Sequence, residues 1–400
     1  MALGGLSLFK QKASVGLLRQ GTLPIAVDFG STALKLLQVS GSETPTLIAA
    51  ATLPTPDTML YDEGKRLAYQ MEQLPSLLKS SGFKGKRVVA VVPGGRTFCK
   101  HLQIQKTEGV ALRSMIDALL PEQLGCPTAA VVYRHTEVEG VSEQHHKAEV
   151  ICMATPRELV ARLMTLFRGC KLEPVGIHNE FGSLLRACRG IRETGGEDAR
   201  PTLYMDLGWT RTKVVIAHGD RMVFARLIDI GGRAFDEAVC GQTKLPLSEA
   251  RRERLAMERV TPGAQAPAPE GDGGEQMAVL SAGMAKAGGG ATRAKTKAGV
   301  KADLSEPLEM LVDEIGHCLR YHESLFGGRR VERAVLVGGE ARHRALGESV
   351  ARAIRVEAQI ADPMAGVART GREPSTGVDF SQAQPGWAQA LGACLSPTDL

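Results

Sequence analysis

Hydrophobic runs and short polar turns alternate in the same order at two places along the chain. Residues 25–39 and residues 203–217 each consist of an apolar strand, an Asp-x-Gly turn and a second apolar strand. The Asp, Gly, Thr and Lys positions of the two copies recur at identical spacings. A third strand follows each copy, at 46–53 and at 222–230, and helical spacing begins after it, at 63–80 in one copy and at 233–240 and 247–260 in the other. This repeat predicts two α/β halves related by duplication.

The segment between the two copies has a pattern of its own. A strand at 86–92 ends at Pro93-Gly94-Gly95, and strand and helix patterns then alternate. We expect a β-α-β-β-α unit over residues 93–178, inserted as a small separate subdomain. Its elements are predicted at 98–104 (strand), 108–120 (helix), 129–138 and 147–154 (strands) and 156–169 (helix), and a helix over 178–189 then leads into the second copy.

One segment of the second half breaks the hydrophobic pattern. Residues 262–303 are rich in Ala, Gly and Pro and contain too little apolar surface to offset the entropy of ordering them, which predicts a flexible surface insertion. Regular elements return as helices at 304–325, 341–354 and 387–394 and a strand at 333–337. The predicted organisation is a basic N-terminal tail (1–22), a first subdomain (23–92) completed by a return helix (179–200), the inserted subdomain (93–178) and the second half (201–400).

Composition narrows the class of protein. With 43% apolar and 23% charged residues, and with 45 Gly and 20 Pro among 400 residues, the chain is typical of a folded, soluble α/β protein with many tight turns. Apolar runs such as 88–92 are far shorter than the roughly 20 residues that cross a bilayer, so we expect no transmembrane helix. The net charge of +5 is too small to indicate nucleic-acid binding. Scattered cysteines without a C-x-x-C pair predict reduced thiols, and the first 27 residues lack a signal-peptide cleavage site.

The two Asp-x-Gly turns carry the main candidate chemistry. Each places a carboxylate at a strand tip, while its glycine lets backbone amides approach a charged ligand. Two such turns facing each other would clasp a polyphosphate, with Asp28 and Asp206 holding Mg²⁺ largely through its water molecules. The residues expected to contact phosphate are Gly30, Ser31, Thr32, Lys35, Gly208 and Thr210. Because a single turn of this kind is ordinarily only a hairpin connection, the hypothesis depends on the repeat.

Two further motifs fit the same ligand. A buried strand followed by Gly338-Gly339-Glu340 lets a flat base or ribose lie on bare backbone, although Glu340 is also a favourable charge at a helix start. Glu180 begins the helix before the second turn and would orient an attacking water or a Mg²⁺-bound water; an acid in the first turn of a capped helix is the alternative. The sequence contains no P-loop, zinc-protease or hydrolase nucleophile motif.

Taken in order, the two Asp turns and the Gly pair resemble the phosphate-1, phosphate-2 and adenosine motifs of the actin-like ATPases, a superfamily that includes heat-shock proteins and sugar kinases. Within this superfamily the sequence is similar to the type IV pilus assembly protein PilM family. The likeness extends to a Leu-Phe-Lys leader ending at Lys10, the strand around Lys35, the strand end at Pro93, the helix acid Glu180 and the Gly231-Gly232 pair. The inserted segment resembles the 1C subdomain that this family shares with the cell-division protein FtsA.

The resemblance implies a duplicated actin-like (ribonuclease H-like) fold with an inserted 1C-type β-α-β-β-α subdomain, holding ATP and Mg²⁺ between its halves. It also implies a cytoplasmic assembly adaptor at the inner face of the inner membrane, serving a pilus or a related secretion machine. The implied partner is the N-terminal cytoplasmic peptide of a PilN-like inner-membrane protein, and pilus motor ATPases are further candidates. Membrane association would be peripheral, through these partners, with the nucleotide biasing the adaptor's conformation.

Two residues depart from the family pattern. Trp209 follows the second Asp-x-Gly where a small residue is usual, and its ring would either crowd the phosphates or turn away into packing. Glu340 stands where a third glycine is frequent. We therefore expect ATP binding with slow or absent hydrolysis.

Three other functions stay open on the sequence. An actin-superfamily small-molecule kinase would need a further acid to act as base on its substrate. An FtsA-like cell-division scaffold would have a clearer amphipathic helix than residues 387–400 provide. The cytoplasmic part of a type II secretion L protein would be followed by a membrane span.

Overall fold

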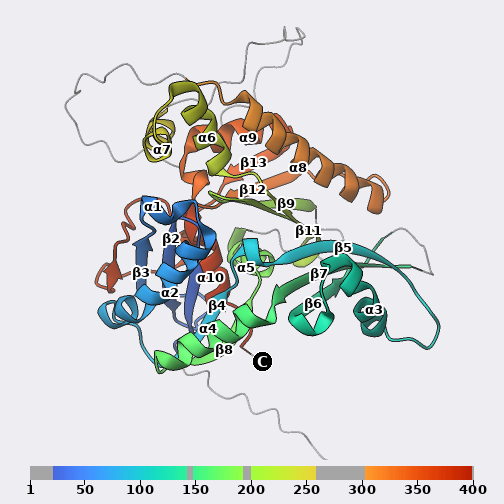
Figure 1. Cartoon of the computed structure of the whole chain (residues 1–400), viewed down its shortest axis with the longest axis horizontal. Helices are drawn as coiled ribbons and strands as arrows, with labels where there is room; N and C mark the ends of the chain where they lie inside the picture. The colour runs from blue at the N-terminus through green and yellow to red at the C-terminus, as the bar shows by residue number, and fades with distance from the viewer. Residues whose placement is uncertain (1–20, 142–146, 192–199, 258–301, 399–400) are drawn as a thin grey trace, which may run out of the picture.

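The computed structural model describes residues 21–141, 147–191, 200–257 and 302–398. These residues form two mixed sheets and a smaller antiparallel sheet (Figure 1). The predicted N-terminal tail and the predicted Ala/Gly-rich insertion lie outside the described residues, except for the last two positions of each. Among the helices of the described ranges, none has the length and apolar character needed to cross a bilayer.

The first sheet has six strands in the order β14-β3-β2-β1-β4-β8. The first three strands in the sequence form an antiparallel meander, and β4 and β8 run parallel to β1. The strands are β1 (Ile25–Phe29), β2 (Ala33–Val39), β3 (Leu47–Pro54), β4 (Arg87–Val91), β8 (Glu173–His178) and β14 (Ser375–Thr376).

Side chains alternate between the two faces of the first sheet, as the pleat requires. Ile25 and Val27 of β1 belong to a hydrophobic cluster with residues of α2 (Glu63–Ser80) and α4 (Arg157–Gly169), whereas Ala26 belongs to the main core. The main core contains residues of α5 (Glu180–Ala187) and α10 (Ala388–Cys394). The sheet is therefore covered by helices on both faces.

The second sheet repeats the plan of the first. Its order is β11-β10-β9-β12-β13, again an antiparallel meander followed by two strands parallel to the first strand of the meander. The duplication predicted from the sequence is present in the strand order. The strands are β9 (Pro201–Leu207), β10 (Thr212–His218), β11 (Arg221–Ile228), β12 (Arg333–Val337) and β13 (Glu357–Ile360), and the helices are α6 (Gly232–Thr243), α7 (Leu247–Ala256), α8 (Ser305–Leu325) and α9 (Arg344–Ile354).

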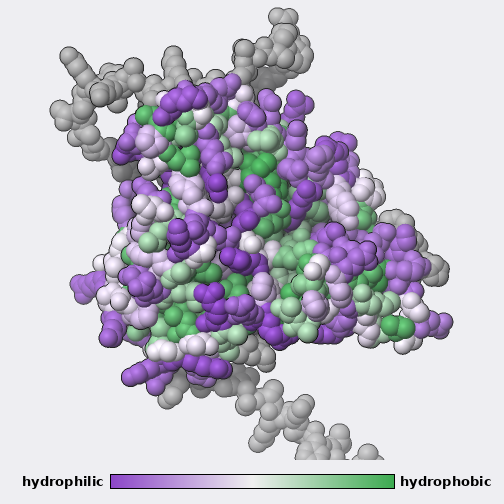
Figure 2. Space-filling model, in the orientation of Figure 1, coloured by the Kyte–Doolittle hydropathy of each residue, from purple (hydrophilic) through white to green (hydrophobic). Residues whose placement is uncertain are grey.

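A three-stranded antiparallel sheet lies between β4 and β8 in the sequence. It consists of β5 (Phe98–Gln105), β7 (Lys147–Pro156) and β6 (Val131–Glu137), and it shares a hydrophobic cluster with α3 (Leu112–Leu124). Its other face packs on the second half, because Ile151 and Met153 share a cluster with Val223 and Phe224 of β11. In Figure 2, hydrophobic surface is visible in the area where these two parts of the molecule meet.

Several predicted boundaries shift for local reasons. The helix expected at 108–120 is α3, which begins at Leu112 because residues 107–110 form a turn, and Gly125 ends it at φ +67°. The helix expected at 178–189 begins at Glu180, because His178 still pairs with β4 as part of β8. The helix expected at 341–354 is a 3-10 turn, η4 (Glu340–Arg342), followed by α9.

Helices α5 and α10 cross at the centre of the molecule. A Cβ atom added to Gly392 would lie 1.8 Å from the Ser183 carbonyl oxygen, so the two helices touch backbone to backbone. Although α10 lies near the end of the predicted second half (201–400), it packs against β1, β2 and β4 of the first sheet. This crossing returns the end of the chain to the cleft between the halves.

Candidate functional site

A cleft of about 660 Å³ lies between the two halves and is lined by both Asp-x-Gly turns. The structure brings together in this cleft nearly all residues that the sequence predicts for the site; Gly338, which packs directly behind the wall, is the exception. The predicted residues that line the cleft are Asp28, Gly30, Ser31, Thr32, Lys35, Glu180, Asp206, Gly208, Thr210, Gly339 and Glu340.

The two turns face each other across the cleft. Ser31 Oγ of the first turn lies 2.7 Å from Thr210 Oγ1 of the second, within hydrogen-bond distance. Both turns require glycine, because a Cβ at Gly30 would lie 2.9 Å from the Ala33 carbonyl oxygen and one at Gly208 would lie 2.5 Å from that of Arg211. The approach of two hydroxyl-bearing turns creates a site at which a ligand can contact both halves.

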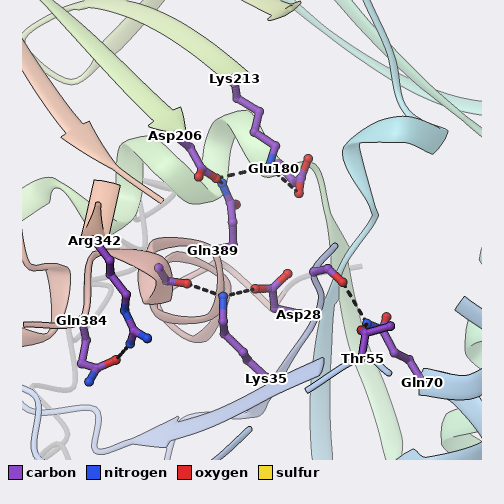
Figure 3. A network of polar contacts seen from close by, with 12 residues as sticks. Asp28, Lys35, Thr55, Gln70, Glu180, Asp206, Lys213, Arg342, Gln384 and Gln389 are labelled. Atoms are coloured by element: carbon purple, nitrogen blue, oxygen red, sulfur yellow. Dashed lines mark hydrogen bonds and ion pairs between the residues drawn. The ribbon is translucent and has the colours of Figure 1, made fainter. Parts of the chain in front are cut away.

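Each turn also carries an Asp–Lys pair in the same strand register. Asp28 of β1 lies opposite Lys35 of β2, and Asp206 of β9 lies opposite Lys213 of β10. Lys35 Nζ is 3.8 Å from Asp28 Oδ2 and donates to the carbonyl oxygen of Gly386. Lys213 Nζ is 3.3 Å from Asp206 Oδ2 (Figure 3). The ammonium group of Lys35 is thus shared between Asp28 and the backbone just before α10.

Glu180 completes a group of three buried carboxylates. It is the first residue of α5, whose N-cap Asn179 accepts a hydrogen bond from the Gly182 amide at 2.8 Å. Glu180 Oε1 lies 3.2 Å from Lys213 Nζ, and no hydrogen-bond partner of Oε2 is found among the described residues. Burial, opposed by Lys213 and reinforced by the charge of Asp206, raises the pKa of Glu180 to about 7. This carboxyl group therefore changes charge near neutral pH.

The other acids and the adjoining glycine are tightly enclosed. Burial raises the pKa of Asp28 above its usual value, although Lys35 and Lys213 oppose the shift. Gly338 adopts φ +106°, and a Cβ there would lie 2.4 Å from Asp206 Oδ1, so this position requires glycine for both conformation and space. Gly338 therefore lies directly behind the carboxylate of Asp206.

Among the residues at the site that the sequence did not predict are two glutamines and a lysine. Gln389 of α10 donates to Asp206 Oδ2 at 2.7 Å, and Gln70 of α2 donates to the Gly30 carbonyl oxygen at 2.8 Å (Figure 3). The third is Lys213, for which the repeat offered a signal, because it aligns with Lys35. Neither glutamine belongs to a sequence motif, since helix packing alone brings Gln389 into the cleft and Gln70 to the backbone of the first turn.

Trp209 is turned into packing, one of the two orientations that the sequence leaves open. Its side chain is buried, with Nε1 donating to Asp236 Oδ2 at 2.6 Å and the ring meeting Tyr61 edge-on at 5.1 Å between centroids. Arg254 donates to Asp236 Oδ1 at 2.6 Å and lies 2.8 Å from Glu340 Oε2. Glu340 is therefore held in a buried ion pair beside the Gly pair.

The carboxylates do not form a direct metal site. In the described part of the chain, no three His, Cys, Asp or Glu side chains are arranged to hold a metal ion. A lysine ammonium lies near both predicted Mg²⁺ aspartates, and Lys213 lies between Asp206 and Glu180. The described residues therefore offer no direct ligand set for Mg²⁺, and the water-mediated Mg²⁺ site at Asp28 and Asp206 stays a prediction.

Two sheets with one strand plan, joined across a cleft by paired Asp-x-Gly turns, define an actin-like protein, as the sequence predicts. A solved structure titled "PilM-PilN type IV pilus biogenesis complex" matches this chain with TM-score 0.65 and 20% identity, over 94% of this chain and 98% of that chain. Lower scores are found for the ethanolamine utilization protein EutJ from Carboxydothermus hydrogenoformans (TM-score 0.45, 13% identity, 94% and 90% coverage) and for MreB5 of Spiroplasma citri bound to ADP (TM-score 0.42, 12% identity, 85% and 91%).

The sequence matches the family model of the type IV pilus assembly protein PilM over residues 26–259, more than half of the chain. The chain therefore belongs to the type IV pilus assembly protein PilM family. A search of the curated proteins finds no match. The resemblance and the actin-like fold expected from the sequence are thus confirmed, while the assignment of residues 93–178 as a 1C-type subdomain stays a prediction.

Proposed function

We propose that this protein is an ATP-binding assembly adaptor of a type IV pilus or a related secretion machine. The observation that carries the proposal is the family match together with a cleft in which both predicted phosphate turns meet, with Ser31 Oγ 2.7 Å from Thr210 Oγ1. Such an adaptor would act by binding its partner in a nucleotide-dependent conformation. The nucleotide would contact both halves and favour one relative arrangement of them.

The cleft residues have separable roles toward the nucleotide. The hydroxyl groups of Ser31, Thr32 and Thr210 would donate to phosphate oxygens, and Lys35 would neutralise phosphate charge. Gly339 would let the base or ribose lie against backbone, with Glu340 held nearby by Arg254. Mg²⁺ would accompany ATP through the phosphates themselves, since the protein offers no direct ligand set in the described residues.

The partner proposed is the N-terminal cytoplasmic segment of a PilN-like inner-membrane protein. Support comes from the solved PilM–PilN complex, in which this chain covers 98% of the matched chain. The adaptor would then work at the cytoplasmic face of the inner membrane, with membrane association and contacts to pilus motor ATPases following from its partners.

The nucleotide part of the proposal is tested by removing one carboxylate. Asp28→Asn should weaken ATP binding by about one to two decades, because the charge that holds Lys35 in position is lost. Isothermal titration calorimetry on the full chain measures this, with Asp220→Asn in the exposed β10–β11 turn as the matched control. Equal affinities for wild type and Asp28→Asn would show that the nucleotide site is elsewhere.

The adaptor part is tested with the partner peptide. A fluorescent peptide of the N-terminal cytoplasmic segment of the PilN-like protein from the same genome should bind the full chain, and saturating ATP should change its affinity. Fluorescence anisotropy with and without ATP measures both effects, and a scrambled peptide serves as control. Failure of the native peptide to exceed the scrambled one would contradict the adaptor role while leaving nucleotide binding intact.

A further inference from the structure

The two lysines of the repeat occupy the same register but have different surroundings. Lys35 is shared between one carboxylate, Asp28, and the carbonyl oxygen of Gly386. Lys213 instead lies 3.2 Å from Glu180 Oε1 and 3.3 Å from Asp206 Oδ2, two carboxylates from different elements. Figure 3 shows its ammonium directed between these two side chains. Lys213 therefore bridges two acids where Lys35 meets one.

The surroundings of Lys213 keep it charged and in place. Burial alone would lower its pKa, but the charges of Asp206, Glu180 and Asp28 outweigh burial and raise it. The lysine side chain is 12% exposed, and Gln389 donates to the same Asp206 oxygen at 2.7 Å, which fixes the orientation of that carboxylate. Lys213 is therefore held directly by two acids and feels the charge of a third, Asp28, which is also close to Lys35.

Little space is left beside this ammonium. A Cβ atom added to Gly94 would lie 2.0 Å from Glu180 Oε2 and 3.4 Å from Lys213 Cε, so the backbone of the β4 end closes one side. On the other side, a Cβ at Gly208 would lie 3.5 Å from Lys213 Nζ. Mg²⁺ gives up its water shell reluctantly, so an ion at this position would have to enter with its waters and displace the ammonium.

We propose that Lys213 is the resident cation of the cleft and occupies the position between Glu180 and Asp206 that a hydrated Mg²⁺ would need. The proposal rests on the proposed function, because ATP is the ligand whose charge this cation helps to balance. Two consequences follow. Mg²⁺ contributes little to ATP affinity, and of the two carboxylate oxygens of Glu180 only Oε2, which has no hydrogen-bond partner among the described residues, is left to orient a water molecule.

The test compares ATP affinity with and without Mg²⁺ by calorimetry on the full chain. Wild type should bind ATP with affinities within about threefold of each other in Mg²⁺ and in EDTA. Lys213→Met should lose about tenfold or more in EDTA and recover when Mg²⁺ is added, because the vacated position then accepts the hydrated ion. Lys35→Met, the matched control at the same register, should weaken binding by a similar factor in both buffers.

The possible results distinguish the role of Lys213 from ATP binding itself. Wild-type binding that falls by more than about tenfold in EDTA overturns the resident cation, and so does a Lys213→Met protein whose affinity is as independent of Mg²⁺ as that of wild type. The wild-type comparison needs no variant, so it decides the matter even if Lys213→Met folds poorly. Absence of ATP binding in both buffers contradicts the proposed function itself.

Discussion

The indole of Trp209 donates its single N–H to Asp236, a buried carboxylate that also accepts from Arg254. Trp209→Phe keeps an aromatic ring beside Tyr61 but leaves Asp236 with one donor fewer. Loss of a hydrogen bond to a buried charge should lower the free energy of unfolding by about 1.5–3 kcal/mol. Because the ring packs against Tyr61 and its N–H is engaged by Asp236, ATP affinity should change little. Chemical denaturation measures the first effect and calorimetry the second.

A double-variant cycle isolates the hydrogen bond in this prediction. In an Asp236→Asn background, Trp209→Phe should cost clearly less, because the charged acceptor is gone. An equal cost in both backgrounds would show that the indole stabilises the fold by packing alone. A marked gain in ATP affinity on Trp209→Phe would instead restore the alternative in which the ring crowds the phosphates.

Among individual residues, the sequence predicts those whose role depends on neighbouring positions in the chain. It misses those that reach the site only because a distant helix packs there. Asp28 and Asp206 are recognisable because each sits in a turn whose glycine and hydroxyl neighbours follow at fixed spacing. Gln389 has no such context, and its hydrogen bond to Asp206 spans 183 residues of sequence. The repeat also does not predict the full role of Lys213. Its second carboxylate partner, Glu180, comes from a helix outside the repeat.

Elements with strong periodicity are predicted well, and short edge elements are not. The meander strands and α8 match their predicted positions closely, because each buries a regular apolar face. The strand β8 was missed, since Pro174 and Gly176 indicate a turn, yet a parallel edge position tolerates both. The strand β13 has only four residues and alternates weakly, so its pairing with β12 supplies the order that its own sequence lacks.

Among the secondary-structure elements, α10 has a position that could not be predicted from the sequence. A helix at 387–394 is predictable from its apolar spacing, but its return to the first sheet depends on the close contact of Gly392 with Ser183. That contact fixes Gln389 beside Asp206 and brings the Gly386 carbonyl oxygen to Lys35. The helix and the 3-10 turn before it (Pro385–Trp387) therefore supply a hydrogen-bond partner to a residue of each Asp–Lys pair.

At the scale of the whole molecule, the cleft is bounded by two halves whose phosphate turns meet directly. Ser31 and Thr210 bring side-chain oxygens within 2.7 Å of each other across the two halves. A ligand whose phosphates enter between the turns must take the place of this contact or widen it. Nucleotide binding is thereby linked to the separation of the halves, which is the physical basis for an adaptor whose conformation depends on ATP.

This linkage predicts that a covalent bond between the turns blocks ATP. In a Ser31→Cys, Thr210→Cys double variant, oxidation should join the two positions, and ATP affinity should fall by about tenfold or more relative to the reduced protein. Reduction should restore binding, because the constraint is removed without changing the sequence. Calorimetry on oxidised and reduced protein measures the change, and the two single variants, treated identically, control for oxidation of the eight native cysteines. Undiminished binding by the oxidised double variant, with the bond verified by mass spectrometry, would show that the phosphates do not pass between the turns.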